Sequence, residues 1–313
     1  MRTINHSKPF YSMSMKILAC CLATAWLMSG CAAHRPTQTR QPVAALAAIP
    51  HETSATNQTI KICTFNIQNF GKTKIGRPDT LKTLVDIVHR FDVVAIQEVS
   101  DSTGVAMKQF ATALNQDGFN YALVVSPRTG RQPNDKSSQE QYAFAFNRKT
   151  VEQVGTALLY NDEKDNFQRE PYVGRFKVRG GNFNFVLITI HAQPERAVEE
   201  IGALHQVNQW AQKMFPDEDD FITVGDYNAS CGYAQPADLR KLELYGDSYV
   251  WVVPDDADTN LAASRCAYDR IVLTKRVTGD YTGKWEVYRS FTDKKISDHW
   301  PVWAEFYTNR DTR

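Results

Sequence analysis

The sequence predicts an α/β fold made of two packed β-sheets flanked by helices. Short apolar runs rich in β-branched residues alternate with segments of helical period, which is typical of βα units. From Tyr142 to Ile190, strand-like runs instead follow one another without a helix, which indicates a β-meander. Six of the apolar runs also begin or end at an Asn, Glu, Asp or His. We therefore expect mixed sheets whose strand ends present polar side chains at a rim.

The strands are predicted from short apolar runs bounded by polar or turn-forming residues. The segment Gly180-Gly181-Asn182 separates two of these runs and predicts a hairpin. The expected strands cover residues 60–65, 93–97, 142–146, 176–178, 183–190, 221–224, 270–273 and 302–306.

Three helices are predicted from apolar residues at helical spacing. The first follows Pro78-Asp79, a favourable helix start, and is expected to end near Phe91-Asp92. The other two cover residues 105–114 and 198–214. No internal repeat and no Pro/Gly-rich linker interrupts residues 60–308, so we expect a single domain there, large enough for one buried core.

Residues 1–31 are expected to form a bacterial export signal. Lys16 precedes the apolar run 17–28, which has the length of a signal's hydrophobic region and is too short to span a bilayer. Met28-Ser29-Gly30-Cys31 is similar to a lipoprotein box and predicts lipidation at Cys31, hence a cell-envelope protein, expected in the outer membrane. Ordinary cleavage without a lipid, giving a secreted protein, is the alternative. Translation from Met13 or Met15 would shorten the signal.

Residues 32–59 are rich in Ala, Pro, Thr, Gln and Ser and have no apolar period. This composition cannot bury enough apolar surface to offset chain entropy, so we expect a flexible tether between the signal and the domain. The lipid is then the only expected contact with a membrane, and we expect the domain to be a monomer.

The formal net charge of +1 excludes a generally basic nucleic-acid-binding surface. Any attraction to phosphate must be local. Basic residues that could provide it, with a solvated surface as the alternative, are Lys72, Lys74, Arg77, Arg128, Arg131 and Lys136.

Three cysteines lie outside the export signal. Cys231 and Cys266 occupy polar loops beside the predicted rim, and we expect them to pair in an oxidising compartment. The bridge would close a loop of about 35 residues and contribute ~3 to 4 kcal/mol in the chain-entropy model. Cys63 alternates into an apolar strand and is expected to be a buried thiol. No CxxC pair or Cys/His cluster indicates zinc.

The polar residues at the strand ends are types that phosphodiester hydrolysis requires. The reaction adds negative charge to oxygen, so it needs a hard cation, a base for water and an acid for the leaving group. Carboxylates suit Mg²⁺ or Mn²⁺, and histidines exchange protons near neutrality. Each residue alone is more simply explained as a turn, surface or structural residue. All of them, however, lie at or next to the end of a predicted strand. They are Asn66, Glu98, His191, Asp226, Asn228, Asp269, Asp298 and His299.

The order of motifs resembles the endonuclease/exonuclease/phosphatase superfamily. The shared set is Thr64-Phe65-Asn66, Ile96-Gln97-Glu98, Ile190-His191, Gly225-Asp226-Tyr227-Asn228 and Ser297-Asp298-His299. Further segments resemble the deoxyribonuclease I-like branch, and they extend the likeness over residues 60–306. They include Ile67-Gln68-Asn69-Phe70-Gly71, Arg169-Glu170-Pro171, the run 254–259 and Cys266-Ala267-Tyr268-Asp269.

The resemblance implies a four-layer α/β sandwich and a divalent-metal-dependent endonuclease that acts on double-stranded DNA with little sequence preference. It implies that Glu98 is the principal Mg²⁺ ligand and that His191 and His299 are the acid and base, in an order that stays open. It also implies that Glu140 orients His191 and Asp269 orients His299. The residues implied to bind phosphate, metal or water are Asn66, Asp226, Asn228, Asp298 and Arg169. A disulfide between Cys231 and Cys266 agrees with the family pattern.

The chain departs from the family pattern at several positions. Residues 161–166 contain no cysteine, so the small second disulfide of the family is absent. Oxygen ligands for a structural Ca²⁺ remain at Asp162 and Asp165 and at Asp258 and Asn260. Two residues implied to contact the DNA grooves are replaced, by Ser100 and Ser138, and residues 132–137 form a polar insertion beside the second. Arg131 or Lys136 could compensate through salt-sensitive phosphate contacts.

Two other functions fit the same residues less well. One is hydrolysis of a phospholipid or phosphoinositide head group on the same fold. It is disfavoured because the sequence contains no aromatic hairpin suited to membrane insertion. The other is a non-catalytic surface-binding protein that has kept the fold, which should have lost catalytic positions, whereas all are present.

Overall fold

The computed structural model describes residues 58–130 and 139–312, which contain two six-stranded mixed β-sheets. The first sheet has the spatial order β11 (Tyr281–Val287), β12 (Val302–Tyr307), β1 (Thr59–Phe70), β2 (Val93–Val99), β4 (Gln141–Asn147) and β3 (Tyr121–Val125). The second has the order β5 (Val151–Leu159), β6 (Tyr172–Val178), β7 (Asn184–His191), β8 (Phe221–Asp226), β10 (Asp269–Thr274) and β9 (Tyr249–Trp251).

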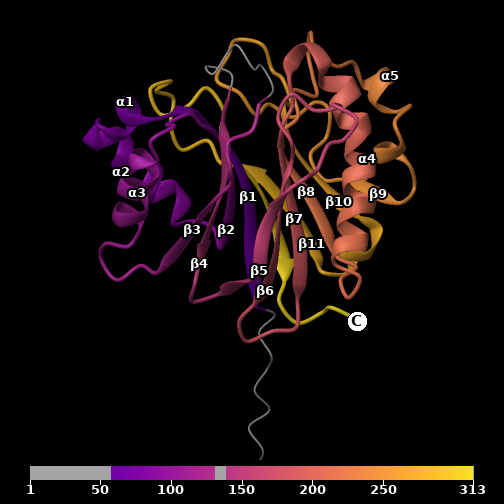
Figure 1. Cartoon of the computed structure of the whole chain (residues 1–313), viewed down its shortest axis with the longest axis horizontal. Coiled ribbons are helices and arrows are strands. Elements are labelled where there is room, and N and C mark those ends of the chain that lie inside the picture. Colours follow the sequence, from indigo (N-terminus) through magenta and orange to yellow (C-terminus); the bar gives the residue numbers. More distant parts are fainter. Residues whose placement is uncertain (1–57, 131–138, 313) are drawn as a thin grey trace, which may run out of the picture. The chain divides into compact units, whose positions relative to one another are not determined.

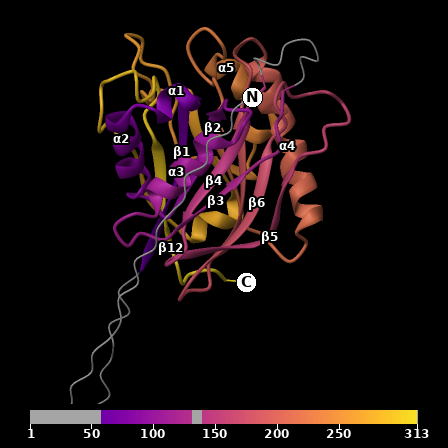
Figure 2. The ribbon, with the colours of Figure 1, turned by 60° about the vertical axis from the view of Figure 1, so that its left-hand side comes forward.

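Helices cover the outer face of each sheet and complete four layers (Figure 1). The first sheet carries α1 (Lys72–Ile75), α2 (Pro78–Val88) and α3 (Val105–Leu114), and the second carries α4 (Ala197–Met214) and α5 (Pro236–Leu239). Short 3₁₀ turns occur at Pro194–Arg196, Glu243–Tyr245 and Lys275–Gly279. Turning the molecule by 60° shows the two sheets packed face to face between the helices (Figure 2). The predicted four-layer sandwich is confirmed.

Three hydrophobic clusters hold these layers together. The central cluster lies between the sheets and includes the stacked rings of Phe144, Tyr172, Phe176 and Phe185. One outer cluster joins α2 and α3 to the first sheet, and the other joins α4 to the second. Burial of apolar surface on both faces of each sheet explains why the central strands are continuous apolar runs rather than alternating ones.

Each sheet has a parallel pair of strands at its centre. In the first sheet β1 pairs in parallel with β2, and in the second β7 pairs in parallel with β8. The α2 and α4 helices make the crossovers within these βαβ units. Because parallel strands end at the same edge, the carboxyl ends of each pair meet at one rim of their sheet.

All eight predicted strands and all three predicted helices are present. The helix starting at Pro78 ends at Val88, about one turn before the expected boundary, and the chain then makes a turn into β2. β3, β5, β9 and β11 were not predicted. These four are the edge strands of the two sheets, and several of their residues are half-buried or exposed.

None of the helices in residues 58–130 and 139–312 combines the length and hydropathy of a membrane-crossing segment. The expected export signal, the lipidation site Cys31 and nearly all of the expected tether lie outside the described residues.

Candidate active site

The polar residues expected at the rim converge on one carboxylate oxygen. Asp226 Oδ2, at the end of β8, lies 3.7 Å from His191 Nε2 and 3.6 Å from His299 Nε2. The same oxygen accepts a hydrogen bond of 3.0 Å from Asn66 Nδ2. Because Asn66 lies in β1 and His191 ends β7, both sheets contribute to this cluster.

A second carboxylate orients each imidazole. Glu140 Oε2 lies 2.8 Å from His191 Nδ1, and Asp269 Oδ2 lies 2.8 Å from His299 Nδ1. A carboxylate accepts hydrogen bonds when ionised, so each Nδ1 is the protonated nitrogen and Nε2 is the nitrogen that faces Asp226. Both rings are more than nine-tenths buried. Each ring is therefore fixed in one orientation with Nε2 toward the rim.

Burial disfavours the charged form of both imidazoles, but the surrounding carboxylates overcome this effect. For His299, Asp269 and Asp226 raise the pKa to about 10 against the effect of burial. For His191, burial and Arg169 lower the pKa, whereas Glu140 and Asp226 raise it, and the net direction is upward. The pKa of Glu140 moves below its ordinary value because His191 and Arg169 outweigh burial. The His191–Glu140 pair therefore favours imidazolium beside carboxylate. In the other pair, burial also raises the pKa of Asp269, although His299 opposes this shift.

Glu98 is held in a strained backbone conformation at the same rim. Its φ of 60° is left-handed, which costs free energy for a residue with a Cβ. Asn66 Nδ2 donates to Glu98 Oε1 at 2.8 Å, and the backbone N–H of Asn69 donates to Oε2 at 2.8 Å. The register of β1 against β2 shifts between Asn66 and Phe70, and this bulge brings Asn69 to the carboxylate. Glu98 Oε1 lies 3.9 Å from His191 Nε2.

Gly225 allows β8 to approach β7 immediately before Asp226. Its φ is 149°, and a Cβ at this position would lie 2.0 Å from the carbonyl oxygen of Ile190. Only glycine fits here, because the obstruction is backbone rather than a movable side chain. The glycine of the Gly225-Asp226 pair thus sets the position of the carboxylate between the two histidines.

Arg169, which was expected to contact phosphate, is bound to protein groups. Its Nε donates to the His191 carbonyl at 3.0 Å, and its Nη1 lies 3.5 Å from Glu140 Oε1. The residue is buried. In this conformation Arg169 binds the backbone of His191 and the carboxylate of Glu140, and so holds this pair in place.

Asn66 and Asn228 are likewise engaged by the protein. Asn66 uses its amide nitrogen on Glu98 and Asp226 and its oxygen on the N–H of Gln68. Asn228 Nδ2 donates to a backbone carbonyl at 2.9 Å, and its own N–H donates to Asp226 Oδ1 at 3.0 Å. The side chain of Asn66 and the backbone N–H of Asn228 therefore position the carboxylates of the rim.

The donor set at the rim fits a hard divalent cation. Each Glu98 oxygen accepts one hydrogen bond and retains a further lone pair. Asp298 Oδ1 is a buried atom that lacks a hydrogen-bond partner among the described residues. One ligand atom each from Asp226, Asp269 and His299 also lie within 4.8 Å of one another. Oxygen-rich sets of this kind suit Mg²⁺ or Mn²⁺.

A buried polar network next to the site carried no signal in the sequence. Gln97 Oε1 accepts from Thr64 Oγ1 at 3.2 Å, and Gln97 Nε2 donates to Thr189 Oγ1 at 2.8 Å. All three side chains are fully buried. Gln97 thus ties β2 of the first sheet to β7 of the second, one residue before Glu98. Only the packed sheets reveal this link.

The predicted disulfide joins Cys231 and Cys266, whose Cα atoms are 5.7 Å apart. It connects the chain just after Asn228 to the chain just before Asp269. Cys63 is a free and buried thiol, as expected. The bridge therefore supports the loops on one flank of the rim.

The two loops considered for structural Ca²⁺ differ. Asp162 accepts hydrogen bonds from the N–H of Phe167 at 2.8 Å and from Asn166 Nδ2 at 3.2 Å. Asp258 Oδ1 is buried without a hydrogen-bond partner among residues 58–130 and 139–312. Asn260 accepts from the N–H of Ala262 at 2.7 Å. Structural Ca²⁺ at these loops stays a prediction.

The basic residues singled out in the sequence have different environments. Lys72 and Arg77 are exposed, whereas Lys74 is buried and cannot reach a phosphate at the surface. Arg128 is half-buried, and its Nη1 donates to the Ser100 carbonyl at 3.3 Å. Arg131, Lys136, Ser138 and the insertion 132–137 lie outside the described residues.

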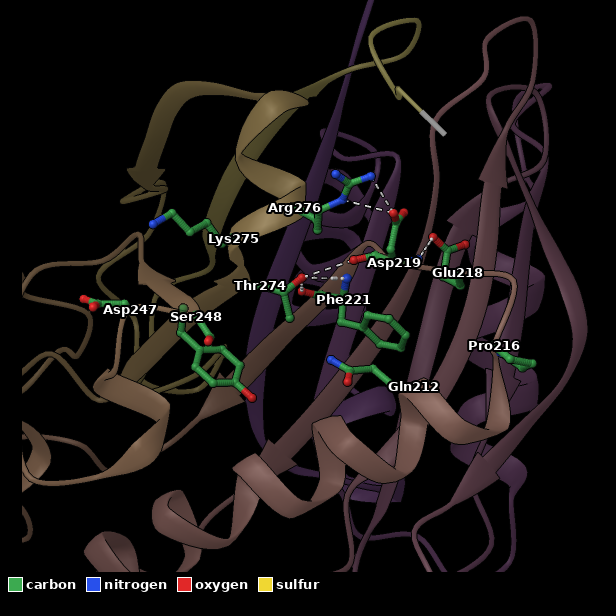
Figure 3. Close-up of a pocket in the computed structure, with 11 residues that line it drawn as sticks. Gln212, Pro216, Glu218, Asp219, Phe221, Asp247, Ser248, Thr274, Lys275 and Arg276 are labelled. Atoms are coloured by element: carbon green, nitrogen blue, oxygen red, sulfur yellow. Dashed lines mark hydrogen bonds and ion pairs between the residues drawn. The ribbon is translucent and has the colours of Figure 1, made fainter.

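A large pocket in the described structure lies away from this rim. It has a volume of about 590 Å³ and includes Phe221, the first residue of β8, whereas Asp226 is the last (Figure 3). Asp219 pairs there with Arg276 at 2.8 Å. This pocket is therefore separate from the candidate active site.

The chain is similar to known proteins over most of its length. The model of the Endonuclease/Exonuclease/phosphatase family matches residues 63–299. Human Deoxyribonuclease-1 is 34% identical over 262 residues, covering 78% of this chain and 91% of its own length. Mouse Deoxyribonuclease-1-like 2 is 32% identical over 268 residues, covering 80% and 92%. The crystal structure of D. rerio TDP2 with a single-strand DNA product has a TM-score of 0.59 at 15% identity, covering 80% and 99%, which shows the shared fold.

A two-sheet sandwich with carboxylates and paired imidazoles at one rim defines a hydrolase class. The chain belongs to the Endonuclease/Exonuclease/phosphatase family and is a deoxyribonuclease I-like member of it. It is therefore an enzyme of this superfamily, and the resemblance inferred from the sequence is confirmed.

Proposed function

We propose that the chain is an exported, divalent-metal-dependent endonuclease that hydrolyses double-stranded DNA with little sequence specificity. The observation that carries the proposal is the convergence of His191 and His299 on Asp226, beside Glu98. The similarity to deoxyribonucleases over most of the chain supports DNA as the substrate. Export and a lipid at Cys31 rest on the N-terminal sequence alone.

Glu98 and Asp298 would hold the cation. When bound, it offsets the negative charge that develops on the phosphate oxygens during cleavage. Asn66 and the N–H of Asn69 fix the Glu98 carboxylate, so its position is set before any ligand arrives. Such preorganisation keeps the reorganisation cost low when charge develops.

The two histidines are placed for opposite proton transfers. The histidine that acts as the base must be neutral, and its Nε2 accepts a proton from the attacking water as the water oxygen bonds to phosphorus. The other histidine is protonated, and its Nε2 donates a proton to the oxygen whose bond to phosphorus breaks. Glu140 and Asp269 hold each Nδ1, so only Nε2 is available to the reactants. The geometry is similar for both rings, and either order of roles fits it.

Asp226 has a positioning role between the histidines. Its Oδ2 lies within 4 Å of both Nε2 atoms, and its Oδ1 accepts from the N–H of Asn228. A carboxylate in this place favours protonation of whichever imidazole acts as the acid. Gly225 supports this role because it allows β8 to approach β7 directly before Asp226.

The proposal predicts nicking of supercoiled plasmid by the purified chain with Mg²⁺ and no nicking with a chelator. Acid-soluble DNA fragments should accumulate while sphingomyelin and phosphoinositide vesicles stay intact. Release of phosphocholine or inorganic phosphate without nicking would favour the phospholipid alternative. Absence of turnover on every substrate would favour a non-catalytic binding protein.

A further inference from the structure

We propose that Lys74 is a positioning residue of the active site, whose buried ammonium group clamps the β1 bulge to the segment that carries Asp298 and His299. The two clamped segments are residues 66–69 and residues 296–299. The activity readouts of this inference rest on the proposed nuclease function, whereas its conformational readout does not.

All three N–H donors of Lys74 are used on backbone carbonyls. Nζ donates to Ile67 O at 2.7 Å, to Gln68 O, and to Ile296 O at 2.8 Å. The residue is only 7% exposed. With no donor left and little access to solvent, Lys74 does not serve as a surface contact for phosphate.

The two carbonyls on the β1 side converge because the bulge turns left-handed. Gln68 and Asn69 have φ values of 34° and 51°, which are uncommon for residues with a Cβ. The N–H of Gln68 donates to the Asn66 side chain, and the N–H of Asn69 donates to Glu98. The ammonium group therefore stabilises the backbone turn from which Gln68 and Asn69 donate their hydrogen bonds to the site.

The third carbonyl belongs to the segment that leads to His299. Ile296 precedes Ser297, whose Oγ donates to the Asn66 carbonyl at 2.7 Å and accepts from the N–H of His299 at 3.1 Å. Lys74 and Ser297 thus tie the same two segments together at two points. At the first of these points the donor is the charged ammonium group of Lys74, which forms stronger hydrogen bonds than a neutral donor does.

The position of Lys74 also balances charge at the rim. Burial lowers the pKa of Lys74 to about 8, and the carboxylates of Glu98 and Asp298 oppose this shift. The same two carboxylates would hold the cation. A buried positive charge near these two carboxylates interacts favourably with them. Ile75 of the short helix α1 packs in the outer core and anchors the helix that carries Lys74.

The test compares Lys74→Met and Lys74→Gln with the parent and with Lys82→Met. Lys82 is an exposed lysine of α2, with a side chain 75% accessible, and serves as the matched control. Plasmid nicking should show a kcat reduced roughly 100-fold, a scale typical of misplaced catalytic groups, with KM for DNA changed less than about threefold. The Mg²⁺ concentration for half-maximal nicking should rise several-fold. Lys82→Met should match the parent in all three.

Hydrogen exchange of the full chain, read by mass spectrometry, supplies the readout that is independent of activity. Lys74→Met and Lys74→Gln should speed exchange in both 66–69 and 296–299 and leave the β7 and β8 peptides unchanged. If the parent fails to nick DNA, the proposed function is wrong, and the exchange pattern still decides the clamp. The positioning role would be overturned if exchange in either segment were unchanged in the variants, or if both variants unfolded globally. If the parent is active, a Mg²⁺ requirement of the variants equal to that of the parent would overturn it as well.

Discussion

At the scale of single residues, the site depends on which nitrogen of each histidine is free. Asp269 is fully buried and accepts from His299 Nδ1, and Thr259 Oγ1 accepts from the N–H of Asp269. An amide in place of this carboxylate would keep the shape but could donate to Nδ1 and favour the other tautomer. The charge of the carboxylate, rather than its volume, is thus the property that the site requires.

Asp269→Asn should therefore lower kcat for plasmid nicking by about two to four orders of magnitude, the range typical of general acid–base catalysis. The circular dichroism spectrum should stay that of the parent. Asp238→Asn is the control, because this residue of α5 is partly exposed, with a side chain 47% accessible, and it should nick at the parental rate. Parental activity in Asp269→Asn would contradict the orienting role.

The residues at strand ends were predictable from the sequence because each follows or precedes an apolar run. His191 and Asp226 are the last residues of β7 and β8, and Asp269 is the first of β10. Lys74 and Gln97 were not predictable as site residues. Their partners are backbone carbonyls and hydroxyls that only packing brings close, and a basic residue in a loop suggests a solvated surface.

At the scale of elements, the rim arises from the two parallel strand pairs and from the connections that bring antiparallel strands back to it. The connection from β8 to β10 is the longest of these and contains α5 and β9. The bridge between Cys231 and Cys266, which are 35 residues apart, closes it. The bridge fixes where β10 begins, and therefore where Asp269 meets His299.

Replacing both bridge cysteines by serine should lower the free energy of unfolding by ~3 to 4 kcal/mol if loop-closure entropy dominates. Urea unfolding monitored by fluorescence measures this difference. Cys63→Ala removes a buried thiol without removing a cross-link, and it should lose less. Equal stability of the double serine variant and the parent would show that the bridge does not constrain the unfolded chain.

The strands that were not predicted from the sequence are the edge strands of the two sheets. β5 and β11 alternate apolar with polar and exposed residues, and β9 is only three residues long. Such strands depend on pairing with their neighbours more than on their own pattern. The central strands, buried on both faces, carry a pattern strong enough to identify them.

At the scale of the whole molecule, the described domain carries acidic groups at both ends of β8. At the end away from the site, Asp220 and Asp280 are each about 3% exposed, and Asp280 Oδ1 has no hydrogen-bond partner among the described residues. Burial and the neighbouring Asp280 and Asp311 raise the pKa of Asp220 to about 8. Burial and Asp311 raise the pKa of Asp280 to about 6.

These shifts predict that stability falls as pH rises. A carboxyl with a raised pKa in the folded state favours the protonated form, so its contribution is complete below the unfolded pKa and lost as pH approaches 8. The melting temperature of the parent, measured with chelator present, should decrease between pH 5 and 9. The corresponding loss in the free energy of unfolding is on the order of a few kcal/mol. Asp220→Asn should flatten this dependence and melt higher than the parent at pH 8. A melting temperature that rises with pH in the parent would contradict the assignment.

The central claim is that Glu98, His191 and His299 act together at one rim on a scissile phosphodiester. The most direct measurement is Mg²⁺-dependent plasmid nicking by Glu98→Gln, His191→Ala, His299→Ala and the double histidine variant. Each single change should reduce the rate at least ~100-fold, the lower range for loss of acid–base catalysis. The double variant should lose far less than the product of the single losses, because the groups act as a unit. Nicking at the parental rate in His191→Ala and Glu98→Gln would contradict the account.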